Sequence, residues 1–205
     1  MAPKKQVVVV GGGGAGADLA RTLSEQLDST KHEITLISAH PYMVYYVASL
    51  RMLVTDKGSL EKQILMPYDK LFVNGNGTFK QGLVTGIQAE KGSKAGGKVV
   101  LQGGEEVKYD VLVLAPGSKW ESFLDFPFNG EKAQEHIAEW RKKFGNAEKV
   151  VIAGGGAVGI GKSSACTIGT KMSSYSSLRT ELAGEIRQFH PVSGTAWNFN
   201  IRTVF

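Results

Sequence analysis

The chain has 205 residues, of which 42% are hydrophobic and 21% are charged, a composition typical of a globular protein with one core, or one core and part of a second. Its formal net charge is +5, but residues 161–205 alone hold five basic and two acidic residues, so residues 1–160 are nearly neutral. With no RNA-binding or helix-turn-helix motif in the sequence, this distribution argues against nucleic-acid binding.

The first residues of the chain carry no targeting or membrane signal. Met1 to Lys5 is basic and leads directly into the apolar run Val7 to Val10, which is too short for a signal-peptide core or a membrane span. Met1-Ala2 also lacks the glycine that N-myristoylation requires. Cys166, the single cysteine, has no disulfide partner and no metal-ligand spacing around it. We therefore expect a cytoplasmic protein without a transmembrane segment or a metal site.

The N-terminal part predicts a strand, a tight turn, a helix and a second strand. Gln6 to Val10 is a β-branched run, Gly11 to Gly14 is the turn, and Ala15 to Leu27 has apolar residues at helical spacing. Glu33 to Ile37 is a second buried strand. Because a helix crosses over between them, the two strands should be parallel, as in a doubly wound α/β sheet.

The middle of the chain predicts an antiparallel meander between Thr78 and Leu114, because short alternating segments are separated by glycine-rich turns. These segments are Leu83 to Ile87, Lys98 to Leu101 and Glu106 to Lys108. Val111 to Leu114 is a further apolar strand, which proline and glycine end at Ala115-Pro116-Gly117-Ser118. After a linker near Lys119 to Gly130, Glu131 to Phe144 predicts a helix. Lys149 to Ala153 then predicts the first strand of a second glycine-rich unit.

Two glycine fingerprints follow predicted strands. Gly11, Gly13 and Gly16 match G-x-G-x-x-G between a strand and a helix. In dinucleotide-binding units the first glycine permits the turn, the second lets the backbone approach a pyrophosphate, and the third lets helix and strand pack closely. The diphosphate then accepts hydrogen bonds at the positive end of the helix. The second fingerprint consists of Gly154, Gly156 and Gly159. The alternative is a glycine-rich loop that binds no nucleotide.

The end of the second strand has a serine where dinucleotide sites usually have an acid. Ser38 can hydrogen-bond a ribose hydroxyl but carries no charge. His40 or backbone groups are other candidates to hold the adenosine end, and the alternative for His40 is an ordinary surface histidine.

Five stretches match a known family in order and spacing: Val7 to Gly16, Val47 to Arg51, Gln81 to Val84, Leu101 to Gly104 and Val111 to Ser118. They resemble FAD-dependent NAD(P)H oxidoreductases of the apoptosis-inducing-factor-like, ferroptosis-suppressor type, within the pyridine nucleotide-disulfide reductase-like superfamily. The resemblance covers residues 6–160 and resumes at 181–191. It implies a Rossmann-type (ββα) FAD-binding domain at 1–120, with a parallel sheet and an antiparallel meander. It also implies the start of a second, incomplete Rossmann unit for NAD(P)H at 121–191, followed by a non-family tail at 192–205.

The same resemblance assigns cofactor contacts by position. Gly11, Gly12, Gly13, Gly14 and Ala15 would cradle the FAD diphosphate. Arg51 would reach the flavin or its phosphates, Val84 would offer its backbone to the adenine, and Gly117 would lie close to FAD. Without the resemblance, Arg51 is interpreted as a surface cation and Val84 as a buried strand residue. Pro116 stands where the family usually has threonine, which removes a hydroxyl and an N–H group.

The implied chemistry is hydride transfer from NAD(P)H to flavin and electron transfer from the reduced flavin to a quinone-like acceptor. The cofactors carry this reaction and the protein positions them, so no catalytic acid, base or nucleophile is expected. The choice between NADH and NADPH and the oligomeric state stay open. The alternative function is that of a non-catalytic nucleotide-binding or interaction fragment.

The second fingerprint is interrupted by Gly161 to Thr180, in which nine of twenty residues are serine or threonine. Joining Ile160 to Glu181 restores the family pattern. We interpret residues 161–180 and 192–205 as retained intron sequence, because the codons available at both starts include splice-donor sequences. The alternative is a genuine surface insertion and a natural tail, and transcript sequencing distinguishes the two.

The part of the family that follows Pro191 has no counterpart in this sequence. We therefore expect an FAD site that is open on one side, weakened NAD(P)H binding, and impaired or absent activity of this truncated chain.

Overall fold

The structure is a computed structural model that describes residues 3–90, 96–147, 150–153 and 175–178. The chain forms two compact units. The first contains Met1–Tyr46 and Glu61–Gln134, and the second contains Val47–Leu60 and Glu135–Phe205.

A four-stranded parallel sheet forms the centre of the first unit, with the strand order β5-β2-β1-β9. The strands are β1 (Lys5–Val10), β2 (His32–Ser38), β5 (Thr78–Gln81) and β9 (Val111–Leu114). Val7 of β1 lies opposite Ile34 of β2 on one side and Val111 of β9 on the other. Because β1 is an inner strand of a parallel sheet, an unbroken valine run at residues 7–10 is the composition expected there.

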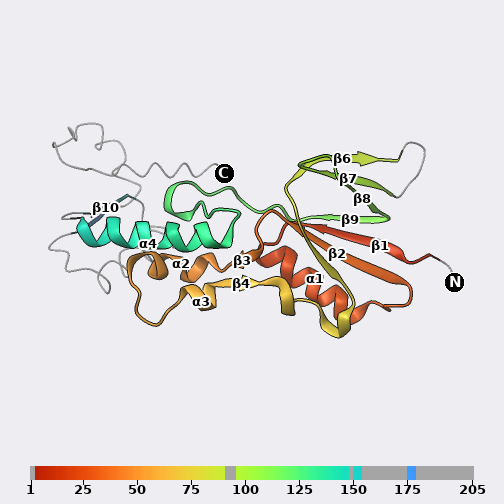
Figure 1. The fold of residues 1–205 in the computed structure, drawn as a ribbon, viewed down its shortest axis with the longest axis horizontal. Helices are drawn as coiled ribbons and strands as arrows, with labels where there is room; N and C mark the ends of the chain where they lie inside the picture. Colours follow the sequence, from red (N-terminus) through yellow and green to blue (C-terminus); the bar gives the residue numbers. More distant parts are fainter. Residues whose placement is uncertain (1–2, 91–95, 148–149, 154–174, 179–205) are drawn as a thin grey trace. The chain divides into compact units, whose positions relative to one another are not determined.

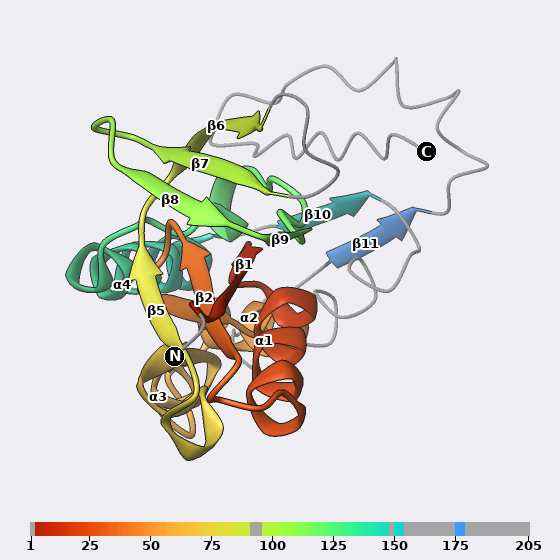
Figure 2. The ribbon, with the colours of Figure 1, turned by 90° about the vertical axis from the view of Figure 1, so that its right-hand side faces the viewer.

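Helix α1 (Gly14–Gln26) covers one face of this sheet, and a three-stranded antiparallel meander covers the other (Figures 1 and 2). The meander consists of β6 (Val84–Ala89), β7 (Gly97–Leu101) and β8 (Glu106–Tyr109). Val9 packs in the core under α1, whereas Val8 packs in the core under the meander. Neighbouring valines can serve both cores because successive side chains of a strand point to opposite faces.

The buried face of α1 is made mainly of small residues: Gly16, Ala17, Ala20 and Ser24. Leu19 and Leu23, which the helical spacing placed toward the core, are only half-buried. Small residues let the helix backbone approach the sheet closely, and this approach determines the geometry of the turn between β1 and α1.

The remaining elements of the first unit are short. They are the antiparallel pair β3 (Tyr42–Val44) and β4 (Leu65–Pro67), the helix α3 (Glu61–Ile64), and the 3₁₀ helices η1 (Tyr68–Lys70), η2 (Val73–Gly75) and η3 (Ser122–Leu124). The predicted linker near 119–130 contains η3, whose Phe123 and Leu124 are buried. The Tyr42 hydroxyl also donates to the Pro127 carbonyl at 2.6 Å. This segment is therefore packed against its own unit.

Among the residues that the structure describes, the second unit contains most of two helices and two short strands. The helices are α2 (Tyr46–Val54) and α4 (Gly130–Asn146). Within this unit, Met52 of α2 and Ile137 of α4 are buried, and Arg141 Nε donates to the Met52 carbonyl at 2.7 Å. The strands β10 (Val150–Ala153) and β11 (Tyr175–Leu178) pair in parallel.

Most of the predicted elements are confirmed within one or two residues: β1, α1, β2, the meander, β9, α4 and β10. The Rossmann-type α/β class, with a parallel sheet and antiparallel strands, is confirmed as well. One assignment was wrong: β5 (Thr78–Gln81) belongs to the parallel sheet beside β2 and not to the meander. The pattern also missed the elements between Ala39 and Gly77, and it did not predict β11, which lies inside the segment interpreted as an interruption.

Candidate nucleotide-binding loop

The turn between β1 and α1 leads directly into the helix. The Gly11 N–H donates to the Ile37 carbonyl at 2.8 Å, which ties the start of the turn to β2. The Ala17 N–H donates to the Gly13 carbonyl at 2.9 Å and makes the first helical hydrogen bond. Gly13 is the N-cap residue, with φ −72° and ψ −178°, and provides no side-chain cap. The amides of the first helical turn therefore have no capping side chain and are available to an anionic ligand.

Two glycines of the fingerprint are required by backbone contacts. Gly11 has a φ of +112°, and a Cβ atom on it would overlap the carbonyl of Ala115. A Cβ atom on Gly16 would overlap the carbonyl oxygen of Gly11. Backbone atoms cannot move aside as a flexible side chain can, so both positions need glycine. These are the first and third glycines of the fingerprint, in the tasks expected of them.

Two other glycines face open space. A Cβ atom on Gly13 or Gly14 would meet no heavy atom within 4 Å, and both residues, like Ala15, are exposed. Among the residues that the structure describes, no packing contact explains why glycine stands at these two positions. A ligand that approaches the backbone closely would explain it, and the second fingerprint glycine has this task in dinucleotide sites.

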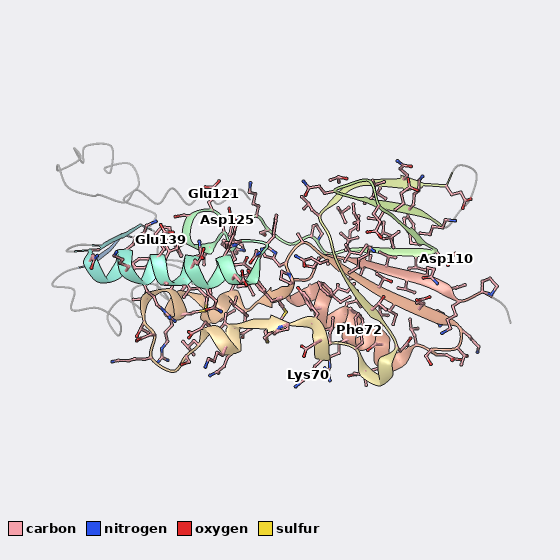
Figure 3. The ribbon with its side chains drawn as sticks, in the orientation of Figure 1. Lys70, Phe72, Asp110, Glu121, Asp125 and Glu139 are labelled. Carbon is pink, nitrogen blue, oxygen red and sulfur yellow. The ribbon has the colours of Figure 1, made fainter. Side chains whose placement is uncertain are left out.

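Gly12 is the buried glycine of the Gly11 to Gly14 run, and its contact with Tyr68 of η1 explains why this position needs glycine. The Tyr68 hydroxyl donates to the Gly12 carbonyl at 2.5 Å. A Cβ atom on Gly12 would overlap this hydroxyl and would also lie close to the Ser38 side chain. Tyr68 itself is 5% exposed, whereas Lys70 at the other end of η1 points away from the ribbon (Figure 3).

Tyr68 is a residue that the sequence reasoning missed. It lies 56 residues after Gly12 in the chain, and no local motif marks it. Burial raises the pKa of its phenol, and a hydrogen bond with Ser38 offsets part of this rise. The phenol therefore stays protonated at neutral pH and remains a donor to Gly12.

Ser38 ends β2, as the sequence predicted, but its side chain is 7% exposed. It lies beside the Tyr68 hydroxyl at Gly12. His40 is half-buried: its Nε2 lies 2.9 Å from the Phe126 carbonyl, and its ring packs edge-on against Phe128 at 4.7 Å between centroids. Both side chains thus have structural contacts, and their contact with a ribose stays a prediction.

Three further candidate cofactor contacts, Gly117, Val84 and Arg51, lie in different surroundings. Gly117 follows β9 with a φ of +70° and is exposed. Ala115, two residues earlier in the strand-end motif, donates its N–H to the Val10 carbonyl at 2.8 Å. The strand-end motif therefore lies beside the glycine turn. Val84 begins β6 and packs, half-buried, on the core under the meander. Arg51 is exposed on α2 in the second unit, and its contact with the flavin stays a prediction.

The second fingerprint cannot be placed, since Gly154, Gly156 and Gly159 lie outside the described residues. In the part of the chain that the structure describes, there is no group of three His, Cys, Asp or Glu side chains that could hold a metal ion.

Residues 5–175 match the family model for pyridine nucleotide-disulphide oxidoreductases. FAD-dependent oxidoreductase FVFD30 of Flammulina velutipes is 42% identical over 140 residues, which are 68% of this chain and 37% of that protein. Ferroptosis suppressor protein 1 of Taeniopygia guttata is 30% identical over 163 residues, 76% of this chain and 38% of that protein. The chain thus spans little more than a third of the length of these relatives.

Among solved structures, the sulfide:quinone oxidoreductase of Aquifex aeolicus is 25% identical and aligns with a TM-score of 0.52 over 73% of this chain and 34% of that protein. The family predicted from the resemblance is confirmed by these matches. The chain belongs to the pyridine nucleotide-disulphide oxidoreductase family, a family of FAD- and NAD(P)H-dependent oxidoreductases.

Proposed function

We propose that this chain is the FAD-binding part of an oxidoreductase that passes electrons from NAD(P)H through flavin to a quinone-like acceptor. The observation that supports this proposal most is that the glycines of the turn fall into two groups. Gly11 and Gly16 are required by the protein's own backbone, whereas Gly13 and Gly14 face open space at the positive end of α1. A dinucleotide diphosphate fits this arrangement because it needs close backbone approach and free amide donors.

The residues around the turn define the proposed site. Residues Gly11 to Gly16 would hold the diphosphate, with the exposed Gly13, Gly14 and Ala15 nearest to it. Gly117 fits a close approach to the cofactor, since its positive φ needs glycine and it follows Ala115, which packs on Gly11. The remaining proposed contacts are Ser38 to the ribose, the Val84 backbone to the adenine, and Arg51 to the flavin.

The quinone-like acceptor is proposed from the relatives. One protein that this chain resembles in structure is named a sulfide:quinone oxidoreductase. When bound, FAD supplies the capacity to take a hydride from NAD(P)H and to give electrons to such an acceptor. The chain's own residues then have to bind and orient the cofactor, and no side chain is proposed as an acid, base or nucleophile.

We propose the same division of the sequence as the resemblance implies: an FAD-binding part at 1–120 and the start of an NAD(P)H-binding part at 121–191, with 161–180 as an interruption and 192–205 as a tail. The strand β10 at Val150–Ala153 fits the start of the second part. Because the chain aligns with 37% of the fungal relative, we expect weak or absent NAD(P)H oxidation by this chain alone.

Within the described residues, no helix is long and apolar enough to cross a membrane. The cytoplasm is the compartment that we propose, because a chain with a single cysteine suits a reducing environment.

Purification of the full chain tests the FAD proposal. We expect a yellow protein with flavin absorbance near one equivalent, and FAD should be the flavin released by denaturation. Incubation with FAD, followed by gel filtration, covers the case in which the cofactor is lost during purification. A folded chain that stays colourless and takes up no FAD contradicts the proposal and favours the fragment alternative.

A further inference from the structure

We propose that Tyr68 is a positioning residue for the glycine turn, an inference that rests on the proposed FAD site. Its hydroxyl holds the Gly12 carbonyl toward η1 and thereby fixes the orientation of the next amides, those of Gly13 and Gly14. Tyr68 itself is not proposed to contact the cofactor.

The first argument is the hydrogen bond to the turn. The Tyr68 hydroxyl donates to the Gly12 carbonyl at 2.5 Å. The Ser38 side chain lies next to this contact, because a Cβ atom on Gly12 would come close to both hydroxyls, and Ser38 offsets part of the rise in the pKa of Tyr68. The consequence is that η1 and the glycine turn are joined through one phenol, with Ser38 of β2 beside it.

The second argument is that the Tyr68 ring is fixed. It packs against Phe79 of β5 with centroids 4.5 Å apart and belongs to the core under α1, together with Val9 and Leu36. A hydroxyl on a fixed ring holds its acceptor in one place, whereas a hydroxyl on a mobile side chain would not.

The third argument is that the contact with the Tyr68 hydroxyl requires glycine at position 12. Residue 12 is a variable position of the G-x-G-x-x-G pattern, so dinucleotide binding alone does not require glycine there. In this chain a Cβ atom would overlap the Tyr68 hydroxyl and crowd Ser38. The extra glycine is thus explained by Tyr68.

The inference also changes the role of Ser38. Its side chain lies beside the Tyr68 hydroxyl and would support the glycine turn through it, which differs from a direct contact with the ribose. If Ser38 acts through Tyr68, replacing it should have little further effect once the Tyr68 hydroxyl is gone.

The test compares Tyr68→Phe with Tyr42→Phe in the full chain. Tyr42 is a matched control because it is 6% exposed and donates to a backbone carbonyl, that of Pro127, at 2.6 Å. Each variant thus loses one buried hydroxyl bond of the same kind. We expect Tyr68→Phe to weaken FAD affinity about threefold to tenfold, the factor for one neutral hydrogen bond, and Tyr42→Phe to leave it within about twofold.

Amide hydrogen exchange of the FAD-free chain gives a second measurement that does not depend on FAD. The bonded amides of Gly11 and Ala17 should exchange faster in Tyr68→Phe and not in Tyr42→Phe. Ser38→Ala, which removes the hydroxyl beside Tyr68, should reproduce the change, and the effects of Ser38→Ala and Tyr68→Phe should be less than additive. Ser38→Ala is also the variant to use if Tyr68→Phe does not fold.

Each outcome has one meaning. Equal rates of amide exchange and equal FAD affinities in the two tyrosine variants overturn the positioning role. Weaker affinity with unchanged exchange also overturns it, because Tyr68 would then act on the cofactor directly. Faster exchange in a chain that binds no FAD keeps the positioning role and rejects the proposed function.

Discussion

Replacing Gly13 with aspartate should abolish FAD retention and leave the fold intact. The position is exposed, its φ of −72° suits any residue, and aspartate is a preferred N-cap residue, so the helix should lose no stability. A carboxylate beside a bound diphosphate is repelled by about 4 kcal/mol at a separation of 4 Å and an effective dielectric constant of 20. We expect FAD affinity to fall roughly a hundredfold to a thousandfold in a fluorescence titration, with an unchanged melting temperature of the FAD-free chain.

Gly13→Asn is the matched control, because asparagine has nearly the same size and N-cap preference without the charge. It should weaken FAD binding through steric obstruction alone, and therefore less than aspartate does. Aspartate and asparagine variants with the same FAD affinity as the unchanged chain would show that the cofactor does not approach this turn.

Replacing Gly16 with alanine should destabilise the FAD-free chain by about 3 kcal/mol or more, at the upper end of overpacking effects. The added methyl group would overlap the Gly11 carbonyl oxygen, and relief requires α1 to move away from β1. Urea unfolding followed by circular dichroism should show a lower midpoint with a similar slope.

Gly14→Ala provides the comparison within the same helix. A Cβ atom there meets nothing within 4 Å, and alanine is a better helix former than glycine by up to about 1 kcal/mol. This variant should be as stable as the unchanged chain or slightly more stable. Equal unfolding midpoints for the alanine variants at 14 and 16 would contradict the close packing of α1 on the turn.

The sequence predicted the β1-α1-β2 unit because its signals are local. A valine run, a glycine cluster and a helical repeat follow one another within Gln6 to Leu27, and each has a known structural preference. The glycine fingerprint therefore located the turn, and the structure shows the same glycines in contact with the backbone of Ala115 and Gly11.

The sequence did not predict β5 because its signal is not local. Thr78–Gln81 has a single large apolar residue, Phe79, so no alternation marks it as a strand of the parallel sheet. It becomes one by pairing with β2, where Thr35 lies opposite Thr78. Strand pairing of this kind depends on tertiary context more than on the composition of the segment.

Tyr68 was missed for the same physical reason. Its contact with Gly12 joins residues 56 positions apart, and an isolated tyrosine after a proline carries no pattern. The sequence correctly placed Ser38 at the end of β2, but its burial and its position beside Tyr68 depend on where η1 lies. Local pattern thus located the site, whereas non-local packing determined which of its side chains are free to meet a ligand.

Amide hydrogen exchange of the unchanged chain with and without FAD tests most directly whether the cofactor binds at the β1-α1 turn. The account predicts that FAD slows exchange of the amides of Gly13, Gly14 and Ala15, the exposed residues at the start of α1. FAD binding without protection of this turn would contradict the account, because the cofactor would then be held elsewhere on the chain.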